Sequence, residues 1–121
     1  MDLENIEKEF SGRSKVLEEL KKIFLRHQEI NKLLEDPKTY EDHKISEKLN
    51  KERAELDKPA KHFKEYVNLI EAISNTKKII DSESDEDIKQ LAKDEIIKDQ
   101  KLKQELEVLL TDLITKTDPN D

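Results

Sequence analysis

Three stretches of the chain repeat apolar residues at steps of three and four, the spacing of one face of an α-helix. The first stretch begins at Ser14 and carries these positions: Val16, Leu17, Leu20, Ile23, Phe24, His27, Ile30, Leu33 and Leu34. Pro37 disfavours helical geometry in the residue before it. The pattern therefore predicts one long helix from Ser14 to Glu35.

The residues before Ser14 carry the same apolar phase in a shorter form. Leu3, Ile6 and Phe10 continue the step of three and four, but Ser11-Gly12 interrupts it. We expect residues 1–13 to form a separate short helix or a frayed extension of the first long one.

The second stretch contains a proline. Its apolar positions are Ile45, Leu49, Leu56, Phe63, Val67, Ile70 and Ile73. Thr39, followed three residues later by Asp42, is typical of a helix cap. Pro59 removes a backbone donor and disfavours a straight helix, yet the apolar phase continues because Leu56 and Phe63 are one heptad apart. We expect either a kink near Pro59 or two collinear helices.

The third stretch follows a polar break at residues 81–85. Ser84 with Asp87 predicts a cap for the next helix, whose first-turn acids would face the positive end of its dipole. Its predicted stripe is Ile88, Leu91, Glu95, Leu102, Leu106, Leu109 and Leu113.

These three long segments and their short connections predict an all-α fold, an elongated antiparallel helical bundle that forms a single helical domain over residues 1–121. Leu, Ile, Val and Phe make up 33 of the 121 residues, enough for a chain with 44% charged residues to fold. We expect central apolar positions such as Leu106 to be buried.

Composition excludes most site chemistry. The chain has one glycine and no cysteine, which leaves no glycine-rich phosphate loop, thiol nucleophile or cysteine-based zinc site. His27, His43 and His62 lack metal-ligand spacing, and His27 is expected to be a boundary residue with a local partner. Carboxylate pairs such as Glu105/Glu107 are predicted to lie on solvated helix faces. We predict no catalytic residue, no metal and no cofactor.

Membrane and secretory signals are also missing from the sequence. No apolar run is long enough to cross a bilayer, and the first residues have no basic head or apolar stretch. We therefore expect a soluble cytoplasmic protein without a membrane partner.

Charge points to one candidate surface. The net charge is −7, which disfavours an independent nucleic-acid site. Acids are concentrated around the break between the second and third segments: Asp81, Glu83, Asp85, Glu86 and Asp87. This acidic turn is either a protein-docking surface for a basic partner or simply a well-capped helix start.

Several segments, in order, resemble the amino-terminal part of bacterial peptide chain release factor one, a class I release factor. They are Arg26–Pro37, Lys48–Leu56, Ala92–Glu95, Leu106–Leu110 and the closing Thr117-Asp118-Pro119-Asn120-Asp121. The resemblance implies a factor that directs translation termination at UAA and UAG codons. In that family the catalytic Gly-Gly-Gln loop and the codon-reading loop lie beyond this region, and this chain has no Gly-Gly pair.

The resemblance therefore implies a non-catalytic amino-terminal domain of a longer factor. Its partners would be the rest of that factor and the stalk-base region of the ribosome, where the domain would dock. Two other hypotheses are a free-standing coiled-coil scaffold or adaptor, whose stripes pair between chains, and a tRNA-binding helical arm, which the net negative charge disfavours.

Overall fold

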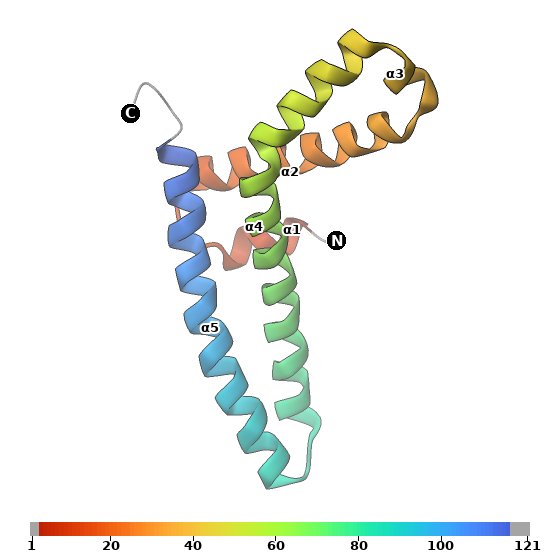
Figure 1. The fold of residues 1–121 in the computed structure, drawn as a ribbon. Coiled ribbons are helices and arrows are strands. Elements are labelled where there is room, and N and C mark those ends of the chain that lie inside the picture. The colour runs from red at the N-terminus through yellow and green to blue at the C-terminus, as the bar shows by residue number, and fades with distance from the viewer. Residues whose placement is uncertain (1–2, 117–121) are drawn as a thin grey trace.

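The computed structural model describes residues 3–116, and within this range it contains five helices and no strand (Figure 1). They are α1 (Leu3–Glu9), α2 (Ser14–Glu35), α3 (Pro37–Glu41), α4 (His43–Ser82) and α5 (Glu86–Thr115). The predicted all-α fold is confirmed. The closing segment Thr117–Asp121 lies outside the described residues.

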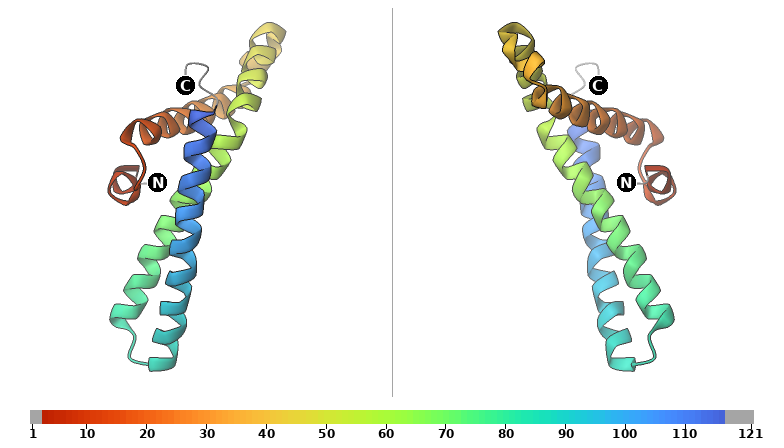
Figure 2. Two further views of the ribbon diagram at one scale, coloured as in Figure 1. Left: turned by 90° about the vertical axis from the view of Figure 1, so that its left-hand side faces the viewer. Right: turned by 90° about the vertical axis from the view of Figure 1, so that its right-hand side faces the viewer.

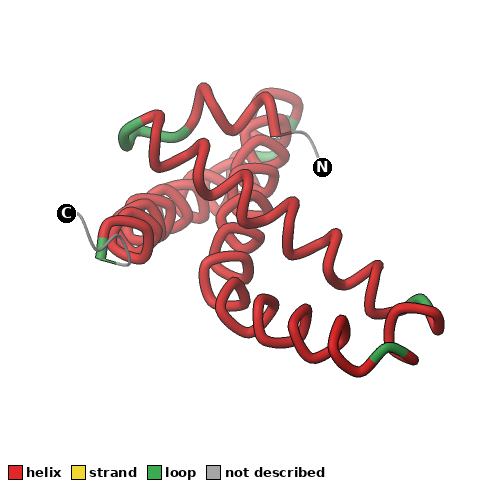
Figure 3. The backbone as a smooth tube through the Cα atoms, turned by 90° about the horizontal axis from the view of Figure 1, so that it is seen from above, coloured by secondary structure: helices red, strands yellow, loops and turns green. Residues whose placement is uncertain are grey.

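Helix α4 is the shared axis of two antiparallel hairpins. It pairs with α5 through the short connection at residues 83–85, and with α2 through α3 (Figures 1 and 2). Seen from above, α2 crosses α4 at an angle instead of following it along its whole length (Figure 3). The three long helices therefore meet only in the middle of the molecule. Each end is an arm built on two of them, with the short helix α3 at the tip of the α2–α4 arm.

The core lies where the helices meet, and we call this region the waist. Its buried residues come from α1, α2, α4, α5 and the segment after α1: Ile6, Phe10, Val16, Leu17, Leu20, Phe24, Phe63, Tyr66, Val67, Ile70, Leu106 and Leu110. Two edge-to-face aromatic pairs join them, Phe10 with Tyr66 (centroids 5.9 Å apart) and Phe24 with Phe63 (5.6 Å). Such pairs add to the stabilisation from apolar burial.

The amino-terminal segment is a separate helix packed on the core. Ile6 and Phe10 are both buried, so α1 is anchored and not frayed. Gly12, in the link to α2, lies against the Phe10 ring, and a Cβ at this position would come within 2.6 Å of the ring atom Cε1. Because glycine has no Cβ, the backbone at position 12 can lie close to the Phe10 ring where the chain turns between α1 and α2.

Pro59 bends one helix and does not divide two. Helix α4 is continuous from His43 to Ser82 with Pro59 inside it. Its axis changes direction in the yellow-green part of the ribbon, around residue 60 (Figure 1). Proline lacks the N–H that would bond the carbonyl four residues earlier, which accounts for the bend.

Helices α4 and α5 are capped by aspartates, and not by the residues that the sequence predicts as caps. The cap of α4 is Asp42, which accepts hydrogen bonds from the amides of Lys44 (3.1 Å) and Ile45 (3.3 Å); Thr39, the predicted cap, lies inside α3. Likewise Asp85, not Ser84, caps α5. Pro37 explains the first shift, because proline is favoured in a first helical turn and here starts the short helix α3.

The predicted stripe of α5 is buried only near the waist. Leu106 is 8% exposed, whereas Leu91 is 70%, Leu102 45% and Ile88 44% exposed. Away from the waist α5 has α4 as its only helical neighbour among the described residues. That contact is narrow. It is made through positions such as Ala92, which is buried, and not through the predicted stripe.

Leu106→Ala should reduce the free energy of unfolding by about 2–5 kcal/mol, because it opens a cavity among buried side chains. Leu91→Ala is the matched control on the same helix, and we expect it to change stability by less than about 0.5 kcal/mol. Chemical denaturation of both variants measures the difference. Equal effects of the two substitutions would contradict the assignment of the buried face of α5.

Candidate docking surface

The five predicted acids lie together at the tip of the α4–α5 hairpin, the end farthest from the waist (Figure 1). Four of them are exposed and Glu83 is partly buried. We call this group of Asp81, Glu83, Asp85, Glu86 and Asp87 the acidic tip. The structure thus brings the predicted residues to one place.

Two members of the acidic tip have a local structural role. The Glu83 carboxylate accepts hydrogen bonds from the amides of Ser84 (3.1 Å) and Asp85 (3.0 Å). The Asp85 carboxylate accepts from the amides of Asp87 (2.9 Å) and Ile88 (3.4 Å). These contacts build the turn and start α5, so neither carboxylate is fully available to a partner.

The other three acids of the tip do not hydrogen-bond the backbone of the turn in this way. Within residues 3–116, the side chains of Asp81, Glu86 and Asp87 make no ion pair. Glu86 and Asp87 lie in the first turn of α5, where the helix dipole favours negative charge. The tip therefore has a stable turn that presents free carboxylates, and its docking role stays a prediction.

One acidic residue outside the tip, Glu107, is buried, against expectation. Glu107 was predicted on a solvated face, but it is only 5% exposed at the waist. Its carboxylate accepts a 2.6 Å hydrogen bond from the Tyr66 hydroxyl, a further one from the Ser11 hydroxyl, and a 3.4 Å bond from the Ser11 amide. Lys103 Nζ lies 3.5 Å away. The sequence gives only a weak indication that Glu107 is buried: Lys103 and Glu107 are spaced three and four residues from Leu106 and Leu110.

This contact changes the ionisation of Tyr66. Burial raises the pKa of the Tyr66 hydroxyl strongly, and the neighbouring Glu107 carboxylate raises it further. Both effects disfavour a tyrosinate, the first by desolvation and the second by repulsion between like charges. The hydroxyl is therefore a fixed hydrogen-bond donor at neutral pH.

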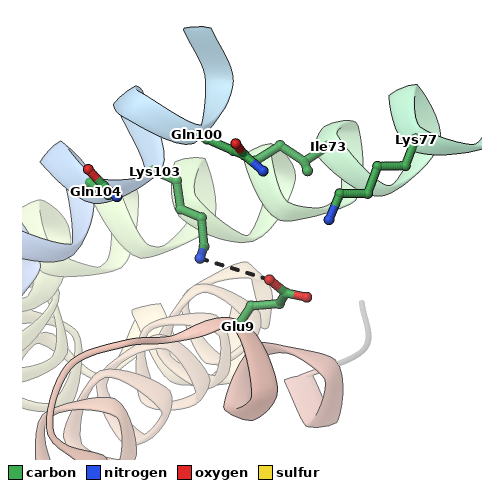
Figure 4. Close-up of a pocket in the computed structure, with 6 residues that line it drawn as sticks. All are labelled: Glu9, Ile73, Lys77, Gln100, Lys103 and Gln104. Carbon is green, nitrogen blue, oxygen red and sulfur yellow. Dashed lines mark ion pairs between the residues drawn. The ribbon is translucent and has the colours of Figure 1, made fainter. Parts of the chain in front are cut away.

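A shallow pocket of about 220 Å³ adjoins this network between α1, α4 and α5. Figure 4 shows Lys103 directed toward Glu9, with Nζ 3.8 Å from the carboxylate, and Lys77 on the other side. Ile73, Gln100 and Gln104 complete the lining. The carboxylates of Glu9 and Glu107 balance the two lysines at the pocket, Lys77 and Lys103, so the pocket has no excess of positive charge to bind an anion.

Polar pairs hold α2 against α4 beyond the waist. Arg26 bonds both carboxylate oxygens of Glu52, through Nε at 2.6 Å and Nη2 at 2.8 Å, and this bidentate contact lowers the pKa of Glu52. His27 Nε2 lies 2.5 Å from Asp57. The expectation of a local partner for His27 is confirmed.

Among residues 3–116, no cluster of three or more His, Asp or Glu side chains has the arrangement to hold a metal ion. No helix in that range has the length and apolar character needed to cross a membrane.

The fold and the site thus define a class of protein: an all-helical domain with a hydrogen-bonded waist and an exposed acidic tip. Comparison with known proteins gives the family: the PCRF domain model matches residues 23–121, and the chain belongs to this family. No solved structure matches the chain.

The chain is also similar to curated proteins named peptide chain release factor 1. It is 36% identical to that of Bacteroides thetaiotaomicron over 111 residues, which cover 92% of this chain and 30% of the relative. With the Listeria monocytogenes protein the identity is 35% over 96 residues, 79% of this chain and 27% of the relative. The chain therefore spans less than a third of the length of these relatives.

Tyr66→Phe should reduce stability at pH 7 by about 1.5–3 kcal/mol, because it removes a buried hydrogen bond to a charged group. It should also change the pH dependence. Above about pH 10 an unfolded tyrosine loses its proton while buried Tyr66 keeps it, so wild-type stability falls as the pH rises further. Urea denaturation between pH 8 and 11 should show a smaller decline for Tyr66→Phe.

Tyr40→Phe is the matched control, since the Tyr40 side chain is exposed. It should leave both the stability at pH 7 and the decline above pH 10 as in the wild type. A Tyr66→Phe profile that runs parallel to the wild-type profile would contradict the assigned role of the hydroxyl.

Proposed function

We propose that this chain is a non-catalytic docking domain of a peptide chain release factor and acts in translation termination at UAA and UAG codons. The observation that carries the proposal is the PCRF domain match over residues 23–121, together with about 35% identity to proteins named peptide chain release factor 1. The resemblance of the sequence to the class I release factors supports the same codons.

Catalysis in this proposal belongs to another part of the factor. The relatives are more than three times as long as the region that this chain matches. The single glycine of the chain excludes a Gly-Gly-Gln loop within it. The domain contributes binding, and hydrolysis of peptidyl-tRNA takes place at a loop outside this sequence.

The docking role is assigned to the acidic tip, with the ribosome as partner in the cytoplasm. Its free carboxylates lie at the end of a two-helix arm, about 20 residues of α5 away from Leu106, the nearest waist residue on that helix, or roughly 30 Å at 1.5 Å per residue. Ribosomal proteins that bind rRNA carry basic surfaces, and the stalk base is the region that the family resemblance implies.

Removal of two tip charges tests this role. Asp81→Asn with Glu86→Gln spares the carboxylates of Glu83 and Asp85, which build the turn. We expect this variant to bind ribosomes stalled at a UAA codon about 2- to 10-fold more weakly at low salt, and with a weaker salt dependence. Titration of the fluorescently labelled chain measures both quantities.

The control variant is Glu18→Gln with Glu19→Gln, which removes the same charge from an exposed face of α2. It should bind as the wild type does. Equal binding of the tip variant and the wild type would show that the acidic tip is not part of the interface. Absence of saturable wild-type binding, or of competition by intact release factor 1, would overturn the docking function itself.

A further inference from the structure

Four exposed residues lie along one face of α5. Leu91, Glu95, Lys98 and Leu102 are separated by four, three and four positions, which places them on one stripe of the helix. Leu91 and Leu102 are 70% and 45% exposed. Among the described residues, Glu95 and Lys98 have no ion-pair partner.

The order of these residues is self-complementary. Along the stripe the sequence runs apolar, acidic, basic, apolar, and in the opposite direction it runs apolar, basic, acidic, apolar. A second α5 placed antiparallel, with a two-fold axis level with residues 96 and 97, brings each Leu91 against Leu102 of the second copy. The same operation brings each Glu95 against Lys98 of the second copy, so one register satisfies all four positions.

We propose that this stripe, Leu91–Glu95–Lys98–Leu102, is the contact surface of a symmetric antiparallel dimer of the chain. Two leucine pairs and two ion pairs form a small interface, below the ~1,200 Å² of a standard stable complex. The dimer is accordingly weak and reversible. The waist uses the other apolar stripes within each copy, so association leaves the fold unchanged. This inference does not depend on the proposed function.

Charge reversal tests the register. Sedimentation equilibrium of the 121-residue chain should show a concentration-dependent monomer–dimer equilibrium. Glu95→Lys places two lysines opposite two lysines, and Lys98→Glu places two glutamates opposite two glutamates. Each variant alone should be monomeric at concentrations where the wild type dimerises, because like charges face each other across the axis.

An equimolar mixture of the two variants should associate again. In the mixed dimer each lysine of one copy faces a glutamate of the other, so both ion pairs return. Lys93→Glu is the control: it makes the same charge change at an exposed position about 140° around α5 from Lys98 and should dimerise like the wild type. Circular dichroism checks that all variants stay folded.

A wild-type chain that is monomeric up to roughly 1 mM, an affinity weaker than about 4 kcal/mol, would overturn the proposal. So would dimerisation that neither reversal weakens, since another surface would then make the contact. Loss of association in the single variants without recovery in the mixture would overturn the antiparallel register.

Discussion

The hydrogen bond from the Tyr66 hydroxyl to the buried Glu107 carboxylate is the contact on which the meeting of the helices depends. A buried carboxylate is costly unless its oxygens are bonded. Ser11 after α1 and Tyr66 on α4 donate hydrogen bonds to Glu107, and Lys103 on α5 forms an ion pair with it. Their convergence fixes the register of α4 against α5. It also holds α1 against the pair and gives a simple apolar waist one specific arrangement.

The two arms follow from this single core. Beyond the waist each arm is a pair of helices, so each helix buries a narrow face and leaves the others to solvent. In the α2–α4 arm, polar pairs such as Arg26–Glu52 join the two helices beside the buried Ile30 and Leu49. In the α4–α5 arm, the carboxylate caps at Glu83 and Asp85 stabilise the turn. Elements with few buried contacts open at low free-energy cost, which suits surfaces that bind partners.

The sequence was informative wherever local chemistry decided the structure. Pro37 ended α2 as predicted, and Leu106 lies in the core as predicted. At Pro59 the sequence left two alternatives, a kink or two collinear helices, and the structure has one continuous helix. The sequence was not informative where contacts between distant residues determine the burial of a side chain. Burial of Glu107 requires Ser11 and Tyr66, which lie 96 and 41 residues away along the chain. Exposure of Leu91 follows from the absence, among the described residues, of a third helix in that arm, which periodicity along α5 does not reveal.

The most direct test of the docking account is cross-linking from the acidic tip. The chain has no cysteine, so Ser84→Cys introduces a single attachment point in the turn, and Glu18→Cys places one on α2 as a control. With ribosomes stalled at a UAA codon, the account predicts that a cross-linker at position 84 captures a protein of the stalk base and that one at position 18 does not. Equal capture from both positions, or capture of a different ribosomal region from position 84, would contradict it.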